Sequence, residues 1–333
     1  MKVLITGAAG YLGEHVALAC REAGHEVTAM VRQPRQGIDL ETMGLQTFLG
    51  DLEQPESWMP ALEGKDAVVH LAGAVRAWAR DRDDFRRVNV RGTLRLVERA
   101  TEVGISRILV TSSLFVLGPS PTGDVQDETA ARRPPAPLLD ANDYVRTKRE
   151  AAERLWKLQE AGHRLMMVYP SVLLGPGQRS PGNHTARVLA DVGASRLPGL
   201  IGDGNQVWNL VSVKDAARGH VAVLERGRSG EGYLLGGENW TQRRLVERAA
   251  HYFGVGAPLR PLGRALPMTV ATLSELWARV SGQEPKLTRG EVRLYDANWA
   301  FSSAKAEREL GYEHEDLEHV LEQTVAWLRA AGI

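Results

Sequence analysis

The feature that most constrains this chain is a glycine-rich segment, Thr6-Gly-Ala-Ala-Gly-Tyr-Leu-Gly13, close to the N-terminus. The apolar run Val3–Ile5 precedes it and is typical of a strand buried on both faces. The apolar residues that follow recur at helical spacing: Leu12, Val16, Cys20 and Ala23. A glycine turn between a strand and a helix lets backbone N–H groups approach a pyrophosphate closely. The segment therefore predicts a dinucleotide-binding site.

The composition limits the classes of protein to which the chain can belong. Its 333 residues include 41 Lys or Arg and 41 Asp or Glu, so no overall positive charge favours nucleic acid or acidic lipid. The single cysteine, Cys20, excludes an internal disulfide and a multi-cysteine metal site, and no metal site is predicted. The chain begins with a strand rather than a signal peptide, and no apolar run approaches the ~20 residues that cross a bilayer. We expect a cytoplasmic protein with no nucleic-acid or membrane partner.

Strand-like apolar runs alternate with helical segments in the first half of the chain. After the first strand, strands are expected at 26–31, 45–49, 67–71, 107–111 and 165–169, and helices near 55–62, 84–103 and 142–161. This alternation predicts an α/β fold with a Rossmann-type, doubly wound parallel sheet. We expect residues 1–170 to form the dinucleotide-binding domain. Residues 171–333 should form mainly a smaller substrate lobe, with segments that return to the first domain.

The second half has a less regular pattern. Strands are expected at 207–213 and 233–235, with Asp215 capping the helix that follows the first of them. Helices are expected at 241–253, 303–310 and 316–330, the first two ended by Gly254 and Gly311. The Pro- and Gly-rich segment 118–137 is too long for an ordinary connection, which predicts that it is either functional or mobile.

Tyr144 and Lys148 are four residues apart on a predicted helix, so their side chains share one face. Ala151, Leu155 and Leu158 continue that face, which indicates that the pair packs inward. A nearby cation favours the phenolate form of a tyrosine, so the pair suits proton exchange with a carbonyl or alcohol oxygen. By itself this spacing also occurs in surface pairs, and its position after a dinucleotide turn favours the catalytic interpretation.

Ser112 and Ser113 end the predicted strand 107–111, at the edge where open α/β sheets place their ligands. A hydroxyl at that edge can donate a hydrogen bond to a substrate oxygen. Two serines can equally close a strand without any such role, and the Tyr144–Lys148 pair favours the functional reading.

Together, these motifs resemble those of the extended short-chain dehydrogenases/reductases in the NAD(P)-dependent epimerase/dehydratase superfamily. Further matching motifs follow in order along nearly the whole chain: Gly50-Asp-Leu52, His70-Leu-Ala-Gly73, Asn89-Val-Arg-Gly-Thr93, Thr111-Ser-Ser113, Tyr169-Pro-Ser171 and the segment 301–311. Within the superfamily, Trp78–Asp81 and Leu235–Asn239 are most similar to dihydroflavonol-reductase-like members, including hopanoid-associated sugar epimerases.

The resemblance implies roles for the matching residues. Tyr144 would be the general acid in ketone reduction or the base in alcohol oxidation. Lys148 would hold the nicotinamide ribose and lower the pKa of Tyr144, and Ser113 matches the catalytic hydroxyl better than Ser112. The residues implied in cofactor binding are Gly7, Gly10, Tyr11, Leu12, Gly13, Asp51, Leu52, Leu71, Ala72, Gly73, Thr111, Tyr144, Lys148, Pro170 and Ser171. By analogy with the family, we also expect a homodimer.

The end of the second strand bears on the choice of cofactor. An acidic residue there would bind the adenosine ribose of NAD, whereas an arginine can pair with the 2′-phosphate of NADP. That strand ends at Arg32, and Arg35 lies nearby. The sequence therefore favours NADP over NAD.

Two departures from family patterns bear on the reaction. Ser112 and Ser113 replace the Asp-Glu pair of the family's 4,6-dehydratases, which removes the acid–base pair for water elimination. Trp208 and Asn209 stand where sugar-nucleotide enzymes often place an arginine on the diphosphate. A small or moderately apolar carbonyl compound is therefore favoured over a nucleotide sugar, with the loops 74–84, 114–140 and 175–206 expected to line its pocket.

Three functions remain open. The first is an NADP-dependent reductase or dehydrogenase for a small carbonyl/alcohol pair. The second is a sugar epimerase that retains its cofactor between half-reactions. The third is a cofactor-sensing protein without turnover, which the complete set of Ser113, Tyr144 and Lys148 disfavours.

Overall fold

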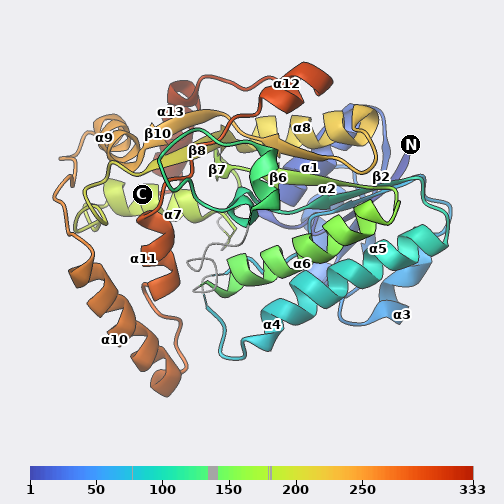
Figure 1. The fold of residues 1–333 in the computed structure, drawn as a ribbon, viewed down its shortest axis with the longest axis horizontal. Helices are drawn as coiled ribbons and strands as arrows, with labels where there is room; N and C mark the ends of the chain where they lie inside the picture. Colours follow the sequence, from blue (N-terminus) through green and yellow to red (C-terminus); the bar gives the residue numbers. More distant parts are fainter. Residues whose placement is uncertain (77, 134–141, 179, 181, 333) are drawn as a thin grey trace.

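A seven-stranded sheet forms the centre of the molecule (Figure 1). The computed structural model describes residues 1–76, 78–133, 142–178, 180 and 182–332. The strand order is β3-β2-β1-β4-β5-β6-β9, and all neighbouring pairs are parallel. The strands are β1 Lys2–Thr6, β2 Glu26–Val31, β3 Gln46–Leu49, β4 Ala67–His70, β5 Arg107–Thr111, β6 Leu165–Pro170 and β9 Gly232–Leu235. The order reverses at β1, which confirms the doubly wound parallel sheet predicted from the sequence.

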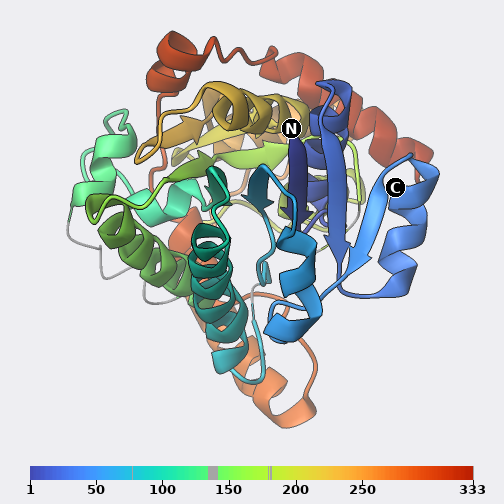
Figure 2. The same cartoon turned by 90° about the vertical axis from the view of Figure 1, so that its right-hand side faces the viewer.

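Helices cover both faces of this sheet (Figure 2). One face packs against α3 Pro55–Trp58, α5 Thr93–Glu102 and α6 Asp143–Glu160. The other packs against α1 Tyr11–Glu22, α2 Pro34–Thr42, α8 Val213–Arg226 and α12 Ala304–Leu310. Short 3-10 segments follow at Met59–Leu62, Leu114–Leu117 and Glu128–Arg132.

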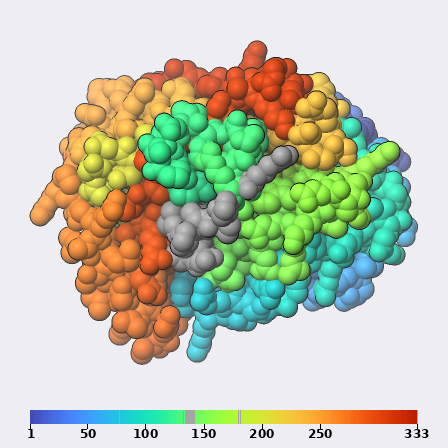
Figure 3. Space-filling model, in the orientation of Figure 1, coloured from blue at the N-terminus to red at the C-terminus, as the bar shows by residue number. Residues whose placement is uncertain are grey.

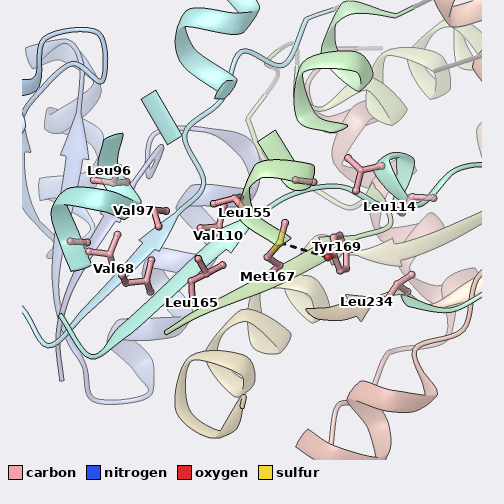
Figure 4. Close-up of a cluster of buried hydrophobic side chains, with 14 of the residues drawn as sticks. Val68, Leu96, Val97, Val110, Leu114, Leu155, Leu165, Met167, Tyr169 and Leu234 are labelled. Carbon is pink, nitrogen blue, oxygen red and sulfur yellow. Dashed lines mark hydrogen bonds between the residues drawn. The ribbon is translucent and has the colours of Figure 1, made fainter. Parts of the chain in front are cut away.

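The two apolar layers explain why the strands lack polar alternation. On β1, Leu4 packs in the layer with α5 and α6, whereas Val3 and Ile5 pack in the layer with α1 and α8. Figure 4 shows the first layer, where Val68 and Val110 of the sheet meet Leu96 and Leu155 of the helices. Both strand faces are therefore removed from water, as parallel sheets require.

A second, three-stranded sheet lies beside the first and has the order β10-β8-β7. Its strands are β7 Val172–Leu174, β8 Val207–Ser212 and β10 Glu238–Thr241. The helices α7 His184–Gly193, α9 Gln242–Phe253 and α13 Leu317–Ala330 pack on it around a third apolar cluster. Two further helices, α10 Ala265–Ser281 and α11 Arg289–Tyr295, extend from the same end of the molecule.

The predicted division at residue 170 remains a prediction. β6 ends at Pro170, and the chain then enters β7 of the second sheet. β9 nevertheless pairs with β6, and α8 and α12 pack on the large sheet. The second half therefore contributes to both sheets.

Asp215 does not cap α8, which corrects the sequence prediction. The strand ends at Ser212, whose hydroxyl accepts a hydrogen bond from Lys214 N at 3.2 Å and caps the helix. Asp215 lies in the first helical turn, where its fully buried carboxylate pairs with Arg218 and accepts from Glu315 N at 2.8 Å. The Asp215 carboxylate therefore joins α8 to the loop before α13, in which Glu315 lies.

The expected helix at 84–103 is interrupted. It consists of a short α4 Asp83–Arg86, a π-helical turn at Arg87–Gly92 and then α5. The π turn contains Asn89, whose side chain bonds to Ala74 and Thr147. The π turn, which has one residue more than an α-helical turn, thus contains the side chain that holds the loop after β4.

Asn209 of β8 links three segments in the interior. Its amide nitrogen donates to the carbonyl oxygens of Gly237 and Phe301, each at 3.1 Å, and its amide oxygen accepts from Gly237 N at 3.1 Å. The side chain is fully buried. All of these groups would lose partners if the amide were removed.

Asn209→Leu should therefore lower the free energy of unfolding by about 2–4 kcal/mol, because buried backbone groups would be left unpaired. Urea unfolding measures this loss. The exposed Asn205→Ala is the control and should change stability by no more than about 0.5 kcal/mol. Equal effects in the two variants would contradict the role assigned to Asn209.

Candidate active site

A cavity of about 860 Å³ lies along the carboxyl ends of β1, β2, β4, β5 and β6. The residues predicted for catalysis or cofactor binding that line it are Gly7, Gly10, Tyr11, Leu12, Gly13, Arg32, Asp51, Leu52, Leu71, Ala72, Gly73, Thr111, Ser113, Tyr144, Lys148, Pro170 and Ser171. Arg35 is the exception, since it is exposed on α2 and is not among the lining residues. The structure thus brings the predicted set together around one space.

The glycines form a cradle at the end of β1. Gly7 has a φ of 73°, and a Cβ at this position would lie 2.5 Å from the backbone nitrogen of Ala72. A Cβ at Gly13 would lie 2.0 Å from the carbonyl oxygen of Gly7. Gly10 occupies the N-cap of α1 and has no side chain to satisfy the first helical amides. These amides and the helix dipole suit a bound phosphate group.

A ladder of buried side chains holds β1 beside β4 beneath this cradle. His70 Nδ1 lies 2.7 Å from Thr6 Oγ1, and His70 Nε2 lies 2.9 Å from Thr93 Oγ1. Burial lowers the pKa of His70 to about 3, so the ring is neutral at physiological pH. Thr6 Oγ1 also accepts from Ala72 N at 3.3 Å, which fixes the loop after β4.

Arg32 is an exposed side chain at the opposite end of the cavity, directly after β2. Its backbone nitrogen donates to Gln36 Oε1 at 3.2 Å, and Gln33 N donates to the same oxygen at 3.0 Å. Gln36 also lines the cavity and was not singled out from the sequence. The Gln33–Gln36 capping box fixes the turn that presents Arg32.

Lys148 is a buried cation anchored on the end of β5. Its Nζ donates to the carbonyl oxygen of Thr111 at 3.0 Å, and burial lowers its pKa to about 8. The other side of Thr111 is held by His220 of α8, whose Nδ1 donates to Ala216 O at 2.6 Å. His220 Nε2 must therefore accept from Thr111 Oγ1, 3.1 Å away. The end of β5 is thus fixed from both layers of helices.

Tyr144 and Ser113 line the cavity together with Lys148. Burial raises the pKa of Tyr144, and a hydrogen bond with Ser113 opposes that rise. The Ser113 oxygen accepts from Phe115 N at 3.3 Å. Its single hydrogen is the donor in the bond that opposes the rise of the Tyr144 pKa. Ser112 also lines the cavity, and its hydroxyl has no hydrogen-bond partner among the described residues.

An aromatic wall lies at the end of the cavity beyond Tyr144. Trp208 stacks on Tyr295 with ring centroids 4.7 Å apart. Phe115 and Trp208 form a T-shaped pair with ring centroids 6.1 Å apart. All three residues line the cavity, together with Leu294 and Val172. Asn209, which stands beside Trp208 where sugar-nucleotide enzymes often place an arginine, is not among the lining residues. Its side-chain amide is used in interior hydrogen bonds.

His184 and Tyr295 place a hydroxyl donor in this wall. Arg187 Nη2 lies 3.1 Å from His184 Nδ1, and because a guanidinium only donates, Nδ1 must accept. Burial lowers the pKa of His184 to about 4, so its one proton resides on Nε2 and is donated to the Tyr295 oxygen at 2.6 Å. The Tyr295 hydroxyl hydrogen is then available to a ligand.

The three predicted substrate loops each contribute to the lining. Val75, Arg76 and Trp78 come from 74–84, Phe115 from 114–140, and Asn183, His184 and Arg187 are among those from 175–206. Residues 77, 134–140, 179 and 181, which belong to these loops, lie outside the described residues. Leu294, Tyr295 and Glu291 of α11 were not predicted, because no local pattern connects α11 with a site more than a hundred residues earlier.

The family follows from this fold and site together with a direct comparison. The NAD dependent epimerase/dehydratase family matches residues 3–236, so the chain belongs to that family. It is an NAD(P)-dependent oxidoreductase of the extended short-chain dehydrogenase/reductase type.

Individual relatives cover nearly the whole chain. A Synechocystis protein with the provisional name dihydroflavonol 4-reductase is 26% identical over 98% of this chain and 94% of its own length. The 2-alkyl-3-oxoalkanoate reductase of Stenotrophomonas maltophilia is 28% identical over 94% of each chain. The crystal structure of gox2253 matches with a TM-score of 0.83 and a sequence identity of 31%. The match covers 99% of this chain and 98% of the gox2253 chain. These relatives agree with the predicted resemblance to dihydroflavonol-reductase-like members.

Lys148→Met should stabilise the cofactor-free protein while abolishing turnover, because it removes a charge whose burial is unfavourable. The gain in the free energy of unfolding should be on the order of 1–3 kcal/mol below pH 8. The folded-state pKa lies below the ordinary 10.5, so the penalty is fully present below about pH 8 and fades as the pH rises toward 10.5. Unfolding at pH 7 and pH 10 tests this dependence, and an equal gain at both would contradict it.

Proposed function

We propose that the protein is an NADP-dependent reductase or dehydrogenase acting on a small, moderately apolar carbonyl/alcohol pair. The observation that carries the proposal is the placement of Ser113, Tyr144 and Lys148 on one wall of the cavity that contains the glycine cradle. The cradle, the buried cation and the proton-exchanging phenol are the parts that this chemistry requires.

The residues present fit a nicotinamide dinucleotide. Gly7, Gly10 and Gly13 leave room for a pyrophosphate that any Cβ at Gly7 or Gly13 would displace through a shift of the backbone. Asp51 and Leu52 would border the adenine, Lys148 the nicotinamide ribose, and Pro170 and Ser171 the nicotinamide. The cofactor supplies or accepts the hydride in such a site.

The chain's own residues manage the proton. Tyr144 would donate its phenolic proton to the carbonyl oxygen during reduction and take it back during oxidation. Ser113 would donate a hydrogen bond to the same oxygen when its hydroxyl hydrogen turns from Tyr144 to the substrate. The Lys148 ammonium, fixed on Thr111 O, would stabilise the tyrosinate that remains after the proton has left.

The preference for NADP rests on charge at the end of β2. Arg32 lines the cavity there, and its exposed guanidinium can form charge-assisted hydrogen bonds with a 2′-phosphate. Arg35, one helical position inside α2, is placed outside the lining and would contribute less.

The aromatic wall supports an apolar substrate. Phe115, Trp208 and Tyr295 offer ring faces and edges, and the free Tyr295 hydroxyl hydrogen would bind one polar group of the substrate. The 2-alkyl-3-oxoalkanoate reductase among the relatives acts, by its name, on a ketone with an alkyl chain. This agrees with a carbonyl compound that carries an apolar substituent.

One observation favours the alternative, a sugar epimerase that retains its cofactor. Arg187 is an exposed cation that lines the cavity, and an arginine of this kind could neutralise a nucleotide diphosphate. Arg187 is, however, already bonded to His184 and lies 3.4 Å from Glu291. An epimerase would purify with bound cofactor and would show no net cofactor turnover, and a sensor without turnover would be insensitive to the loss of Tyr144.

The predicted homodimer and cytoplasmic location remain proposals. By analogy with the family, the dimer contact would be a four-helix interface. Sedimentation of the purified protein would test the oligomeric state.

Tyr144→Phe should lower kcat for NADPH-dependent carbonyl reduction by about 100-fold or more, because the proton donor is lost. Oxidation of NADPH is followed by absorbance against a panel of aldehydes and ketones, and cofactor affinity by protein fluorescence. The surface variant Tyr252→Phe is the control and should retain full activity. Unchanged turnover in Tyr144→Phe would eliminate the proposed proton donor.

Arg32→Asp should weaken NADPH binding by about tenfold or more and bring NADH affinity closer to that of NADPH, because the carboxylate repels a 2′-phosphate and can accept from a ribose hydroxyl. Arg35→Asp makes the same charge change on the same turn and should have a smaller effect. Fluorescence titration with both cofactors measures the two variants. Tighter NADH than NADPH binding by the wild-type protein would overturn the preference.

A further inference from the structure

The helix α10 presents an apolar face to solvent. Trp277 is 64% exposed and Val280 is 84% exposed, which is unusual for large apolar side chains. The exposed apolar residues of this helix are Leu266, Val270, Leu273, Leu276, Trp277 and Val280. Most recur in alternating steps of four and three, so they form one continuous stripe along the helix. Figures 1 and 2 show α10 projecting from the body of the molecule, and Figure 3 shows its segment, in orange, at an outer edge.

The opposite side of α10 fixes the helix on the protein. Pro267, Ala271 and Ala278 are buried, and Glu275 accepts from Arg289 Nε at 2.9 Å. Lys286 N also donates to Ser274 Oγ at 2.9 Å, which ties the following loop to the helix. The stripe is therefore held outward by packing and hydrogen bonds, and whatever covers it must come from outside the chain as described.

Charges around the stripe indicate the kind of partner. Residues 255–295 contain six Lys or Arg and three Asp or Glu, although the whole chain has a net charge of zero. Arg279 and Lys286 flank the stripe, and within the described residues neither forms an ion pair of the kind that joins Arg264 to Asp296. The helix itself contains no charge except Glu275 and Arg279. An apolar stripe with an exposed tryptophan and flanking cations matches the interface of an anionic bilayer.

These charges disfavour a second copy of the chain as the occupant. A parallel pairing of two α10 helices through this stripe would bring the two Arg279 side chains together. An antiparallel pairing would bring Arg279 of each copy toward Arg264 of the other, a charge that Asp296 of the same chain balances in part. Like charges in such contacts are unfavourable. A surface of anionic headgroups has no such conflict.

The segment that carries the stripe also forms part of the cavity. Glu284 and Pro285 lie in the loop that leaves α10, and Leu294 and Tyr295 lie in the helix that follows; all four line the active-site cavity. A protein docked through α10 would thus hold this end of its cavity near the lipid.

We propose that α10 docks the protein on the surface of an anionic lipid bilayer, and that the carbonyl substrate is an apolar compound taken from that bilayer. The source of the substrate rests on the proposed function, whereas the docking of α10 does not. This proposal departs from the expectation, based on overall charge, that the chain has no membrane partner: the local charge and the exposed stripe carry it instead.

Co-sedimentation of the full-length protein with vesicles, without cofactor or substrate, tests the docking. We expect retention on phosphatidylcholine vesicles containing about 30 mol% phosphatidylglycerol, weaker retention on phosphatidylcholine alone, and partial release in about 0.5 M NaCl. Leu273→Glu and Trp277→Glu should each weaken vesicle binding by about tenfold or more. Val103→Glu, which adds the same charge at another exposed apolar site, should bind as the wild type does.

Melting temperature and oxidation of NADPH by a water-soluble carbonyl compound should be unchanged in both α10 variants, since neither residue lines the cavity. The docking is overturned if the wild-type protein stays in the supernatant with both vesicles, or if the α10 variants bind as it does. It is also overturned if the wild type is an oligomer that Trp277→Glu dissociates and that no vesicle retains. Vesicle binding without any NADPH oxidation would leave docking intact and count against the proposed function alone.

Vesicles loaded with a long-chain 2-alkanone test the source of the substrate. We expect the wild type to reduce this ketone with a lower KM than Trp277→Glu shows, and the two proteins to have equal KM for the water-soluble carbonyl compound. Equal KM for the vesicle-borne ketone in the two proteins would overturn delivery from the bilayer.

Discussion

The close contact between the turn after β1 and the loop after β4 is the constraint on which the site depends. Because Gly7 has no side chain, the backbone of Ala72 can lie so close to the Gly7 Cα that a Cβ there would clash with it. The Thr6–His70 hydrogen bond and the bond from Ala72 N to Thr6 Oγ1 hold the same two segments together. The cradle and the loop Leu71–Gly73 are therefore two sides of one packed unit. A cofactor seated there is positioned by backbone groups that cannot move independently.

Lys148 shows how the fold accepts an unfavourable group for the sake of its chemistry. A buried ammonium with one bond to Thr111 O is destabilising, and its lowered pKa expresses that penalty. The surroundings reduce its freedom: a Cβ at Gly73 would lie 3.3 Å from the Lys148 Nζ, and Asn89 holds the same loop through Ala74. The rigid end of β5, bonded to both Lys148 and His220, then fixes the ammonium relative to Tyr144. Position, more than intrinsic acidity, is what this arrangement provides.

The first half of the chain could be predicted because its signals are local. The strands β1, β4, β5 and β6 of the large sheet each contain an apolar run of at least three residues, and Gly7–Gly13 requires one particular turn. Tyr144 and Lys148 share a helix face, so their proximity also follows from sequence spacing alone. Arg35 shows the limit of such reasoning, because proximity in sequence to Arg32 did not place it on the cavity: the helix α2 begins between them and directs them differently.

The substrate end could not be predicted in the same way, because it is assembled from segments far apart in the chain. Phe115, Trp208 and Tyr295 come from a 3-10 turn, a strand of the small sheet and a short helix, and only the tertiary fold stacks them. The α10 stripe was missed for a different physical reason. No helix was expected at 265–281. Even with the helix recognised, its stripe would have indicated a buried face, because apolar periodicity normally marks a face that packs on a core. Of the three aromatic residues, only Tyr295 lies in the continuous segment 265–295 that also carries the α10 stripe. That segment therefore joins the substrate end of the cavity to the exposed stripe, whereas Ser113 follows β5 and Tyr144 and Lys148 lie on α6.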